Sequence, residues 1–208
     1  MIWEYIANVA LGYLLGSVPY GLIVGYVFTG KDVRKYGSGK TGVTNVLRVA
    51  GPAPAAIVLV ADVTKGAIPA VVGNQIFGDA GVAAAGCGAA VVGHVLPVFA
   101  HFRGGRGVAT AFGGILGLAP LLAVFFPLIG AVLLGATRIV SFMSVVGTPI
   151  AVALVLFGAQ QGWTSWEVAY YAVFALIVIE LMHIPNIRRL LAGTEPKIGQ
   201  GGDRPATG

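Results

Sequence analysis

Residues 31 to 48 contain the side chains best suited to bind a phosphate group. Gly37, Gly39 and Gly42 allow backbone turns in which N–H groups converge on an anion, and Ser38 adds a hydroxyl. Arg48 adds a guanidinium that can bind phosphate through two parallel hydrogen bonds. The spacing is not that of the nucleotide-binding loop G-x-x-x-x-G-K-[ST]. An ordinary solvated loop is the alternative interpretation of these residues taken alone.

A second polar segment, residues 93–110, could contribute to the same site. Gly104, Gly105 and Gly107 precede an apolar run that predicts a helix, and Arg106 adds a positive charge at its start. Backbone N–H groups and the helix dipole attract anions at that position. A charged loop at the membrane surface is the alternative. We interpret His94, about one turn inside the membrane, as a structural histidine.

The third polar segment, residues 183–197, could supply a proton acceptor. His183 can act as a base near neutral pH, and Asn186 can donate a hydrogen bond to a carbonyl or a phosphate. Their spacing places both on one side of a helix, although Pro185 would disturb that helix. Structural capping is the alternative for both residues.

Two charged residues lie inside an apolar segment. Asp62 and Lys65 are three positions apart and therefore share a helix face. Charges at that depth are costly unless they are paired or face a polar cavity. We expect both to point toward the polar site, either as a structural ion pair or in contact with substrate.

The composition is that of an integral membrane protein. Of the 208 residues, 57% are hydrophobic and only 10% are charged, and the mean hydropathy is +0.87. The 13 Lys and Arg residues occur in short clusters between apolar stretches, which argues against nucleic-acid binding. The single cysteine, Cys87, excludes a disulfide framework and a multi-cysteine metal site. We expect neither a cofactor nor a bound metal.

The apolar stretches predict an all-α protein of about seven transmembrane helices, some of them short. A spanning helix needs about 20 mostly apolar residues. Arg106 and Arg138 are separated by too few residues for two full crossings, so this part is either two short helices meeting at Ala119–Pro120 or a re-entrant segment. The predicted segments are 4–28, 53–74, 80–100, 108–119, 120–137, 139–159 and 166–184.

The distribution of positive charge predicts the orientation. Lys and Arg follow the first, third, fifth and seventh segments, whereas the connections near 74–79, 119–120 and 160–167 contain none. Because cytoplasmic loops are enriched in these residues, we place the N-terminus outside and the C-terminus in the cytoplasm. The three polar segments then lie on the cytoplasmic side and could form one site. We expect one membrane domain over residues 1–198, followed by a disordered tail over 199–208.

Taken together, these segments resemble the bacterial membrane family of acyl-phosphate-dependent glycerol-3-phosphate acyltransferases. The likeness runs from the first apolar segment to Glu195. The residues that carry it are Gly16–Gly21, Asp32, Arg34, Gly37–Gly39, Thr44, Asn45, Arg48, Asp62, Lys65, Gly66, Gly93, His94, Gly104–Thr110, Arg138, Ser141, His183, Asn186 and Glu195. The chain departs from the family pattern at Lys40, where Asn is usual, at Arg103 and Arg106, where Lys is usual, and at Ile184, where Arg is usual.

The resemblance implies transfer of a fatty acyl group from acyl phosphate to the 1-hydroxyl of glycerol 3-phosphate, giving lysophosphatidic acid and phosphate. It implies a multi-pass protein of the bacterial inner membrane, in contact with membrane lipid, whose active site faces the cytoplasm. The enzyme that produces acyl phosphate is a candidate partner. We expect catalytic roles for Ser38, His183 and Asn186 and structural roles for Asp62 and Glu195. We expect substrate contacts from Gly37, Gly39, Lys40, Thr44, Asn45, Arg48, Lys65, Gly104, Gly105, Arg106, Gly107 and Ser141.

Several mechanisms and one other function remain open at this point. Ser38 and nearby amides would hold the acyl phosphate, while Arg48, Arg106 and Lys65 would hold glycerol 3-phosphate. The base would be His183, assisted by Asn186, or an oxygen of a substrate phosphate. A covalent acyl-Ser38 intermediate is less favoured, because the donor is already activated. The alternative function is a transporter or flippase for a phosphorylated solute.

Overall fold

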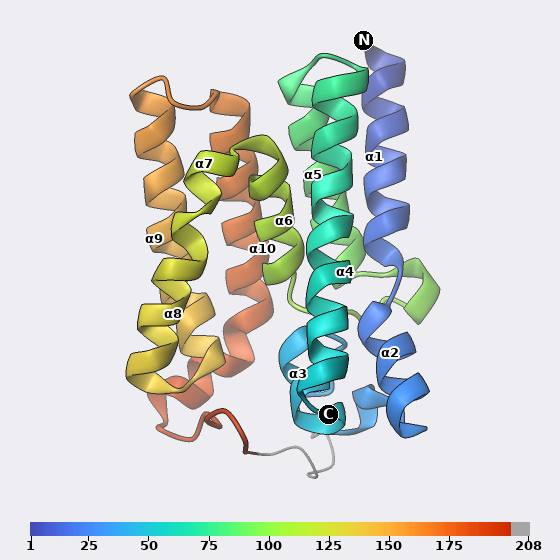
Figure 1. Ribbon diagram of the computed structural model, residues 1–208, viewed down its shortest axis with the longest axis vertical. Helices are drawn as coiled ribbons and strands as arrows, with labels where there is room; N and C mark the ends of the chain where they lie inside the picture. Colours follow the sequence, from blue (N-terminus) through green and yellow to red (C-terminus); the bar gives the residue numbers. More distant parts are fainter. Residues whose placement is uncertain (201–208) are drawn as a thin grey trace.

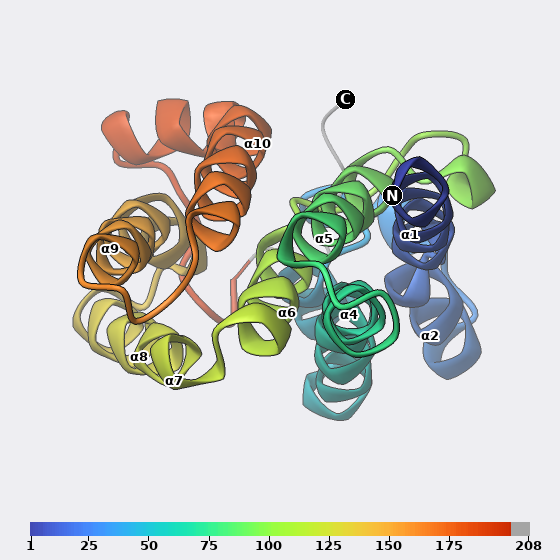
Figure 2. The same ribbon diagram turned by 90° about the horizontal axis from the view of Figure 1, so that it is seen from above.

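A computed structural model of the protein describes residues 1–200, and its regular elements are all helices (Figures 1 and 2). The prediction of an all-α fold is confirmed over this range. The predicted tail, 199–208, falls almost entirely outside the described residues. The α-helices are α1 (Ile2–Ser17), α2 (Tyr20–Thr29), α3 (Val43–Ala50), α4 (Pro52–Val71), α5 (Ala80–Val95), α6 (Val108–Leu118), α7 (Pro120–Ala123), α8 (Phe125–Thr137), α9 (Val140–Gln160) and α10 (Trp166–Leu191).

Within residues 1–200, six helical segments are long and apolar enough to cross a membrane. They are Ile2–Thr29, Pro52–Ile76, Ala80–Ala100, Pro120–Thr137, Val140–Gln160 and Trp166–Leu191. The predicted first helix, 4–28, is broken into α1 and α2 because Pro19 lacks an N–H and forces Val18 into an extended conformation. The predicted helix 166–184 is longer in the structure, since α10 continues through Pro185 to Leu191.

The stretch between Arg106 and Arg138 forms a helical hairpin. Helix α6 has 11 residues and is therefore about 16 Å long, well short of the roughly 30 Å of a bilayer core. The chain reverses at Ala119, and Pro120 begins α7. Figure 1 shows α6 rising and α8 descending, with the turn that joins them below the ends of α5 and α9. Two short helices meeting at Ala119–Pro120 were one of the two predicted alternatives.

Glycines allow the central helices to approach closely. A Cβ at Gly12 or Gly16 of α1 would overlap the backbone of α5, and one at Gly66 of α4 would overlap Thr110 of α6. Small residues bring membrane helices close enough for extensive van der Waals contact, which replaces the hydrophobic driving force that is missing in lipid. Figure 2 shows the result: α4, α5 and α6 lie between α1 and α2 on one side and α8, α9 and α10 on the other.

Asn8 joins three of these helices. It is fully buried, and its Nδ2 donates to the carbonyl of Pro69 in α4 at 3.0 Å and to that of Val82 in α5 at 2.8 Å. Pro69 lies just before the π-helical turn Val72–Ile76, η2, in which regular α-helical hydrogen bonding is lost. The amide of Asn8 therefore stabilises α1 against α4 at the point where α4 is irregular.

We predict that Asn8→Ala lowers the melting temperature in detergent. Loss of two interhelical hydrogen bonds should cost about 1–2 kcal/mol, or roughly 2–8 °C for a chain of this size. Gln75→Ala, which removes an exposed amide from the same π-helical turn, is the control and should leave the melting temperature unchanged. Equal melting temperatures for Asn8→Ala and the wild type would contradict this role.

Candidate active site

One cavity of about 560 Å³ brings residues from all three predicted polar segments together. It lies among α3, α6, α8, α9 and α10, and its wall is polar at one end and apolar along the rest. The polar wall contains Ser38, Lys40, Thr44, Asn45, Asp62, His94, Arg106, Ser141 and His183. The apolar wall includes Phe112, Ile115, Phe126, Ile129, Met143 and Val152. A ligand with a charged head and a long apolar tail matches this division.

Asn45 holds the loop before α3 in shape. Its Oδ1 accepts from Ser38 N–H at 2.9 Å, and its Nδ2 donates to the carbonyls of Val33, Tyr36 and Lys40 at 2.8, 3.2 and 2.9 Å. These bonds use both ends of the amide, and the side chain is 1% exposed. Asn45 therefore has a structural role in this loop, and it also lines the cavity, where the predicted substrate contact stays a prediction.

Two amides of the predicted anion-binding loop are already used within the protein. Ser38 N–H is bonded to Asn45, and Gly39 N–H is bonded to the carbonyl of Tyr36 at 3.0 Å. Gly37 and Gly39, with φ of 57° and 68°, serve to turn the chain. The hydroxyl of Ser38, the ammonium of Lys40 and the first turn of α3 still line the cavity. The N–H groups of a first turn have no acceptor within their own helix.

The turn before α6 presents Arg106 to the cavity. Gly107 caps α6 with φ +87°, a conformation that other residues rarely adopt. Gly104 and Gly105 pack so closely against His94 that a Cβ on either would overlap it. Their role is therefore steric, and Gly105 N–H is donated to the His94 carbonyl at 3.1 Å. The first turn of α6, beginning with Val108, also lines the cavity.

Two guanidinium groups near the polar end lack a hydrogen-bonded partner on Nε. Nε of Arg106 and Nε of Arg48 are both buried, and neither has an acceptor among residues 1–200. Burial lowers the pKa of Arg106 to about 10, against the opposing effect of the Glu195 carboxylate. Burial likewise lowers the pKa of Arg48. Both groups stay charged at neutral pH, so the site carries positive charge that the protein itself does not neutralise by direct contact.

Lys40 adds to this positive charge. Its side chain lines the cavity, and burial together with the neighbouring Arg106 lowers the pKa of Lys40. A bound phosphate would relieve the repulsion between the two cations. The departure from the family pattern at residue 40 therefore falls on the substrate cavity itself.

His183 faces the cavity as a hydrogen-bond acceptor. The structure places its Nδ1 2.8 Å from the carbonyl oxygen of Ile179, which can only accept, so Nδ1 carries the proton. Nε2 of the neutral ring is then free to accept a proton. Helix α10 holds this residue in place because it continues through Pro185, as proline-containing membrane helices can when neighbouring helices support them.

Glu195 ties the segment after α10 to the site. Its Oε1 accepts from Ser141 Oγ at 2.7 Å and from Asn186 Nδ2 at 2.6 Å, and its Oε2 accepts from Arg189 Nε at 2.7 Å. Burial opposes the ionisation of Glu195, but the hydrogen bonds from Ser141, Asn186 and Arg189 outweigh it and lower the pKa. The geometry agrees with the structural role expected for Glu195. It also leaves Oδ1 of Asn186 buried and without a donor within the described chain.

Asp62 and Lys65 form an ion pair, with Lys65 Nζ 2.9 Å from Asp62 Oδ1. Lys65 does not line the cavity, and its Nζ also donates to the carbonyl of Val18 at 3.3 Å. Its predicted contact with substrate is therefore replaced by a structural one. His94 does line the cavity, although the sequence indicated only a structural histidine. The only cue was its place just before the glycine turn.

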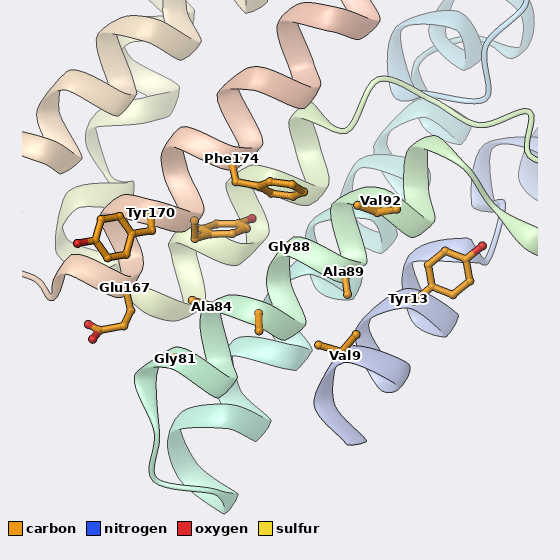
Figure 3. A pocket seen from close by; sticks show the side chains of 12 residues that line it. Val9, Tyr13, Gly81, Ala84, Gly88, Ala89, Val92, Glu167, Tyr170 and Phe174 are labelled. Carbon is orange, nitrogen blue, oxygen red and sulfur yellow. The ribbon is translucent and has the colours of Figure 1, made fainter. Parts of the chain in front are cut away.

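A second hollow, of about 610 Å³, lies between α1, α5 and α10. Figure 3 shows its small and aromatic lining, including Val9, Ala84, Gly88 and Phe174. Its lining residues include one carboxylate, Glu167, and no cation, so it does not suit a phosphate. Over residues 1–200 no group of three His, Cys, Asp or Glu side chains is arranged to hold a metal ion.

Known proteins share this architecture. Residues 6–193 match the family model described as glycerol-3-phosphate acyltransferase. Glycerol-3-phosphate acyltransferase 3 of Dehalococcoides mccartyi is 42% identical over 216 residues, covering 96% of this chain and 98% of its own. The glycerol-3-phosphate acyltransferase of Rhizobium meliloti is 41% identical over 197 residues, covering 95% and 94%.

Two crystal structures of PlsY, an integral membrane glycerol 3-phosphate acyltransferase, are similar in fold. The glycerol 3-phosphate form matches with a TM-score of 0.86 at 36% identity, over 94% of this chain and 96% of that one. The lysophosphatidic acid form matches with a TM-score of 0.84 at 35% identity, over 94% and 95%.

We predict that Glu195 makes stability depend on pH in the acidic range. Because its folded-state pKa lies below the ordinary value of 4.5, its contribution is present above that value and is lost as the pH falls through the folded-state pKa. Glu195→Gln should lower stability at neutral pH by about 1.5–3 kcal/mol and flatten the acid dependence of the melting temperature. Glu4→Gln, which removes a carboxylate near the N-terminus and remote from this segment, is the control. An unchanged acid profile in Glu195→Gln would show that this carboxylate does not anchor the segment.

Proposed function

Because the chain belongs to the glycerol-3-phosphate acyltransferase family, we propose that it transfers a fatty acyl group from acyl phosphate to the 1-hydroxyl of glycerol 3-phosphate. The products are lysophosphatidic acid and inorganic phosphate. The observation that carries the proposal is one cavity with unneutralised guanidinium groups near its polar end and an apolar remainder. A transporter is not supported, because the polar side chains gather at one end of the helices.

Glycerol 3-phosphate would bind through its phosphate to Arg48 and Arg106. Each has a buried Nε–H without an acceptor, and a phosphate oxygen is the acceptor that such a donor favours. The nearby carboxylate of Glu195 accepts hydrogen bonds from Ser141, Asn186 and Arg189, and it makes no ion pair with either guanidinium within the described residues. The phosphate would therefore supply the negative charge that the site lacks.

The glycerol hydroxyls would meet two acceptors on α10. Nε2 of His183 is an acceptor because Nδ1 is bonded to Ile179. Oδ1 of Asn186 is an acceptor because Nδ2 is bonded to Glu195. We assign the 1-hydroxyl to His183 and the 2-hydroxyl to Asn186. Glu195 thereby fixes the orientation of the Asn186 amide.

Acyl phosphate would bind with its phosphate at the first turn of α3 and its chain along the apolar wall. Ser38, Lys40 and Thr44 offer two hydroxyls and an ammonium at that end. The apolar wall runs between α6, α8, α9 and α10, and Phe112, Phe126 and Met143 are part of it. A chain buried there contributes about 0.8 kcal/mol per methylene.

The reaction then needs alignment more than activation, because acyl phosphate already carries a good leaving group. The 1-hydroxyl oxygen attacks the acyl carbon while its proton passes to Nε2 of His183. The bond between the acyl carbon and the phosphate oxygen breaks, and phosphate leaves with the bonding electrons. Ser38 and Lys40 stabilise the leaving phosphate, which takes up the proton from His183 and restores the neutral ring.

We predict product formation from acyl phosphate and glycerol 3-phosphate alone. Purified protein in detergent should release phosphate and form lysophosphatidic acid from palmitoyl phosphate without added metal or coenzyme A. Palmitoyl coenzyme A should be inactive as the donor. Product formation from palmitoyl coenzyme A alone, or loss of activity on addition of EDTA, would contradict the proposed reaction.

A variant of Ser38 distinguishes phosphate binding from covalent catalysis. Ser38→Ala removes one hydrogen bond to a charged group, so we expect a rate loss of about ten- to a few hundredfold. Labelled acyl phosphate supplied without acceptor should leave no label on the wild-type protein. A stable acyl ester on Ser38 that passes its chain to glycerol 3-phosphate would overturn direct transfer.

We further propose seven passes through the bacterial inner membrane, with the active site facing the cytoplasm. Helices α5 and α8 run toward the same end in Figure 1, so the short α6 must return the chain between them. Figure 1 shows the N-terminus and the connections α4–α5 and α9–α10 at one end, opposite α2, α3 and the α8–α9 connection. The latter end carries the Lys and Arg clusters, which favours the cytoplasm.

We predict opposite labelling of the two ends. In a Cys87→Ala background, a cysteine at Ser38 should react with an impermeant thiol reagent only after the cytoplasmic side is opened. A cysteine at Gln161 should react in intact cells. Reaction of both positions from the same side would contradict the proposed topology.

A further inference from the structure

Three buried ionisable residues beside the cavity have no part in the proposed reaction. Asp62, Lys65 and His94 are 1%, 3% and 6% exposed. They come from α4 and from the end of α5, and all three lie inside helical segments long and apolar enough to cross a membrane. Charged groups at such a position are costly, and a buried ion pair is weak support for stability by itself. Their placement next to the substrate cavity suggests a contribution to function.

Lys65 fixes Asp62 to the break between α1 and α2. Its Nζ lies 2.9 Å from Asp62 Oδ1, donates to the Val18 carbonyl at 3.3 Å and stands 5.6 Å from the ring centre of Tyr20. Asp62 and Tyr20 lie on the helices α4 and α2, and Val18 contributes a backbone carbonyl. Lys65 therefore holds the Asp62 carboxylate on one side. Asp62 is also part of the cavity wall.

Asp62 in turn faces His94. Nδ1 of His94 lies 3.6 Å from Oδ1 of Asp62, which is an electrostatic contact longer than a hydrogen bond. Neither Nδ1 of His94 nor Oδ2 of Asp62 has a hydrogen-bond partner within residues 1–200. The imidazole therefore has one charged neighbour on that side, and this neighbour favours a ring orientation with Nδ1 toward α4.

His94 then shapes the turn that carries Arg106. The opposite edge of its ring, at Nε2, packs against Gly105, where a Cβ would overlap it. Its carbonyl accepts from Gly105 N–H at 3.1 Å and leaves no room for a Cβ at Gly104. The ring and the backbone of His94 thus contact both glycines that immediately precede Arg106.

Arg106 depends on this turn for its position. Nε of its guanidinium is buried and has no hydrogen-bond partner among residues 1 to 200, so no protein acceptor fixes this side of the group before substrate binds. We propose that Lys65, Asp62 and His94 form a positioning relay that holds the Gly104–Gly107 turn and so directs Arg106 toward the phosphate of glycerol 3-phosphate. The inference rests on the proposed function through the role of Arg106.

The test compares two variants of His94. His94→Phe keeps a ring against Gly105 but removes the nitrogen that faces Asp62. His94→Asn places an amide N–H near the position of Nδ1 and so restores that contact. Displacement of a substrate-binding group by about 1 Å can cost up to 100-fold. We expect His94→Phe to raise the KM for glycerol 3-phosphate roughly 10- to 100-fold with the KM for palmitoyl phosphate unchanged, and His94→Asn, which restores the contact to Asp62 but lacks the ring edge against Gly105, to recover only part of this loss.

The outcomes separate the relay from a structural role. The control is His101→Phe, which replaces an exposed histidine in the connection between α5 and α6. This variant should match the wild type. An unchanged KM for glycerol 3-phosphate in His94→Phe would overturn the relay, as would an equal rise in both KM values. A wild-type protein inactive with palmitoyl phosphate would instead contradict the proposed function.

A double-mutant cycle tests whether His94 acts through Arg106. Arg106→Gln removes the guanidinium, so His94→Phe should cause little further loss of kcat/KM for glycerol 3-phosphate in that background. Fully additive losses would overturn the relay. The neutral pair Asp62→Asn with Lys65→Met avoids an unpaired buried charge, and it should raise the same KM as His94→Phe does. A normal KM in that pair variant would exclude Asp62 and Lys65 from the relay.

Discussion

Positive charge that the protein does not neutralise by direct contact is the constraint on which this structure depends. Arg48 and Arg106 present buried Nε–H groups without acceptors among residues 1–200, and Lys40 adds an ammonium to the cavity that Arg106 lines. Such an arrangement is unfavourable without an anion, because each buried donor has lost water and gained no partner. It is explained if the substrate phosphates supply the missing charge. The unpaired cations then lower the stability of the free protein and favour binding of the substrate phosphates.

The surrounding elements hold these cations in place without neutralising them. Asn45 shapes the loop before α3, the glycine turn on His94 carries Arg106, and Glu195 joins α9 to the segment after α10. Each uses its polar atoms on the protein and leaves the cations free. The short α6 also leaves the cations free, because its N-terminus lies at the cavity, which α10 also lines.

The sequence predicted the types of site residue better than their individual roles. Ser38, Arg106 and His183 could be identified because a hydroxyl, a cation after glycines and a histidine at a helix end are rarely placed together in so apolar a chain. The hydrogen bonds that Asn45 and Lys65 make within the protein could not be predicted, since they reach carbonyl groups distant in sequence, at Val33 and Val18. The sequence likewise did not predict that the helix would break at Pro19 and continue through Pro185. Whether neighbouring helices support a proline is a property of packing that local sequence does not contain.

The most direct test of the central claim is the melting temperature of Arg106→Gln in detergent, with and without glycerol 3-phosphate. If Arg106 is an uncompensated cation kept for the substrate, its neutral replacement should melt at or above the temperature of the wild type without ligand. Glycerol 3-phosphate should raise the melting temperature of the wild type and much less that of the variant. A variant that melts well below the wild type and is still stabilised fully by glycerol 3-phosphate would contradict the account.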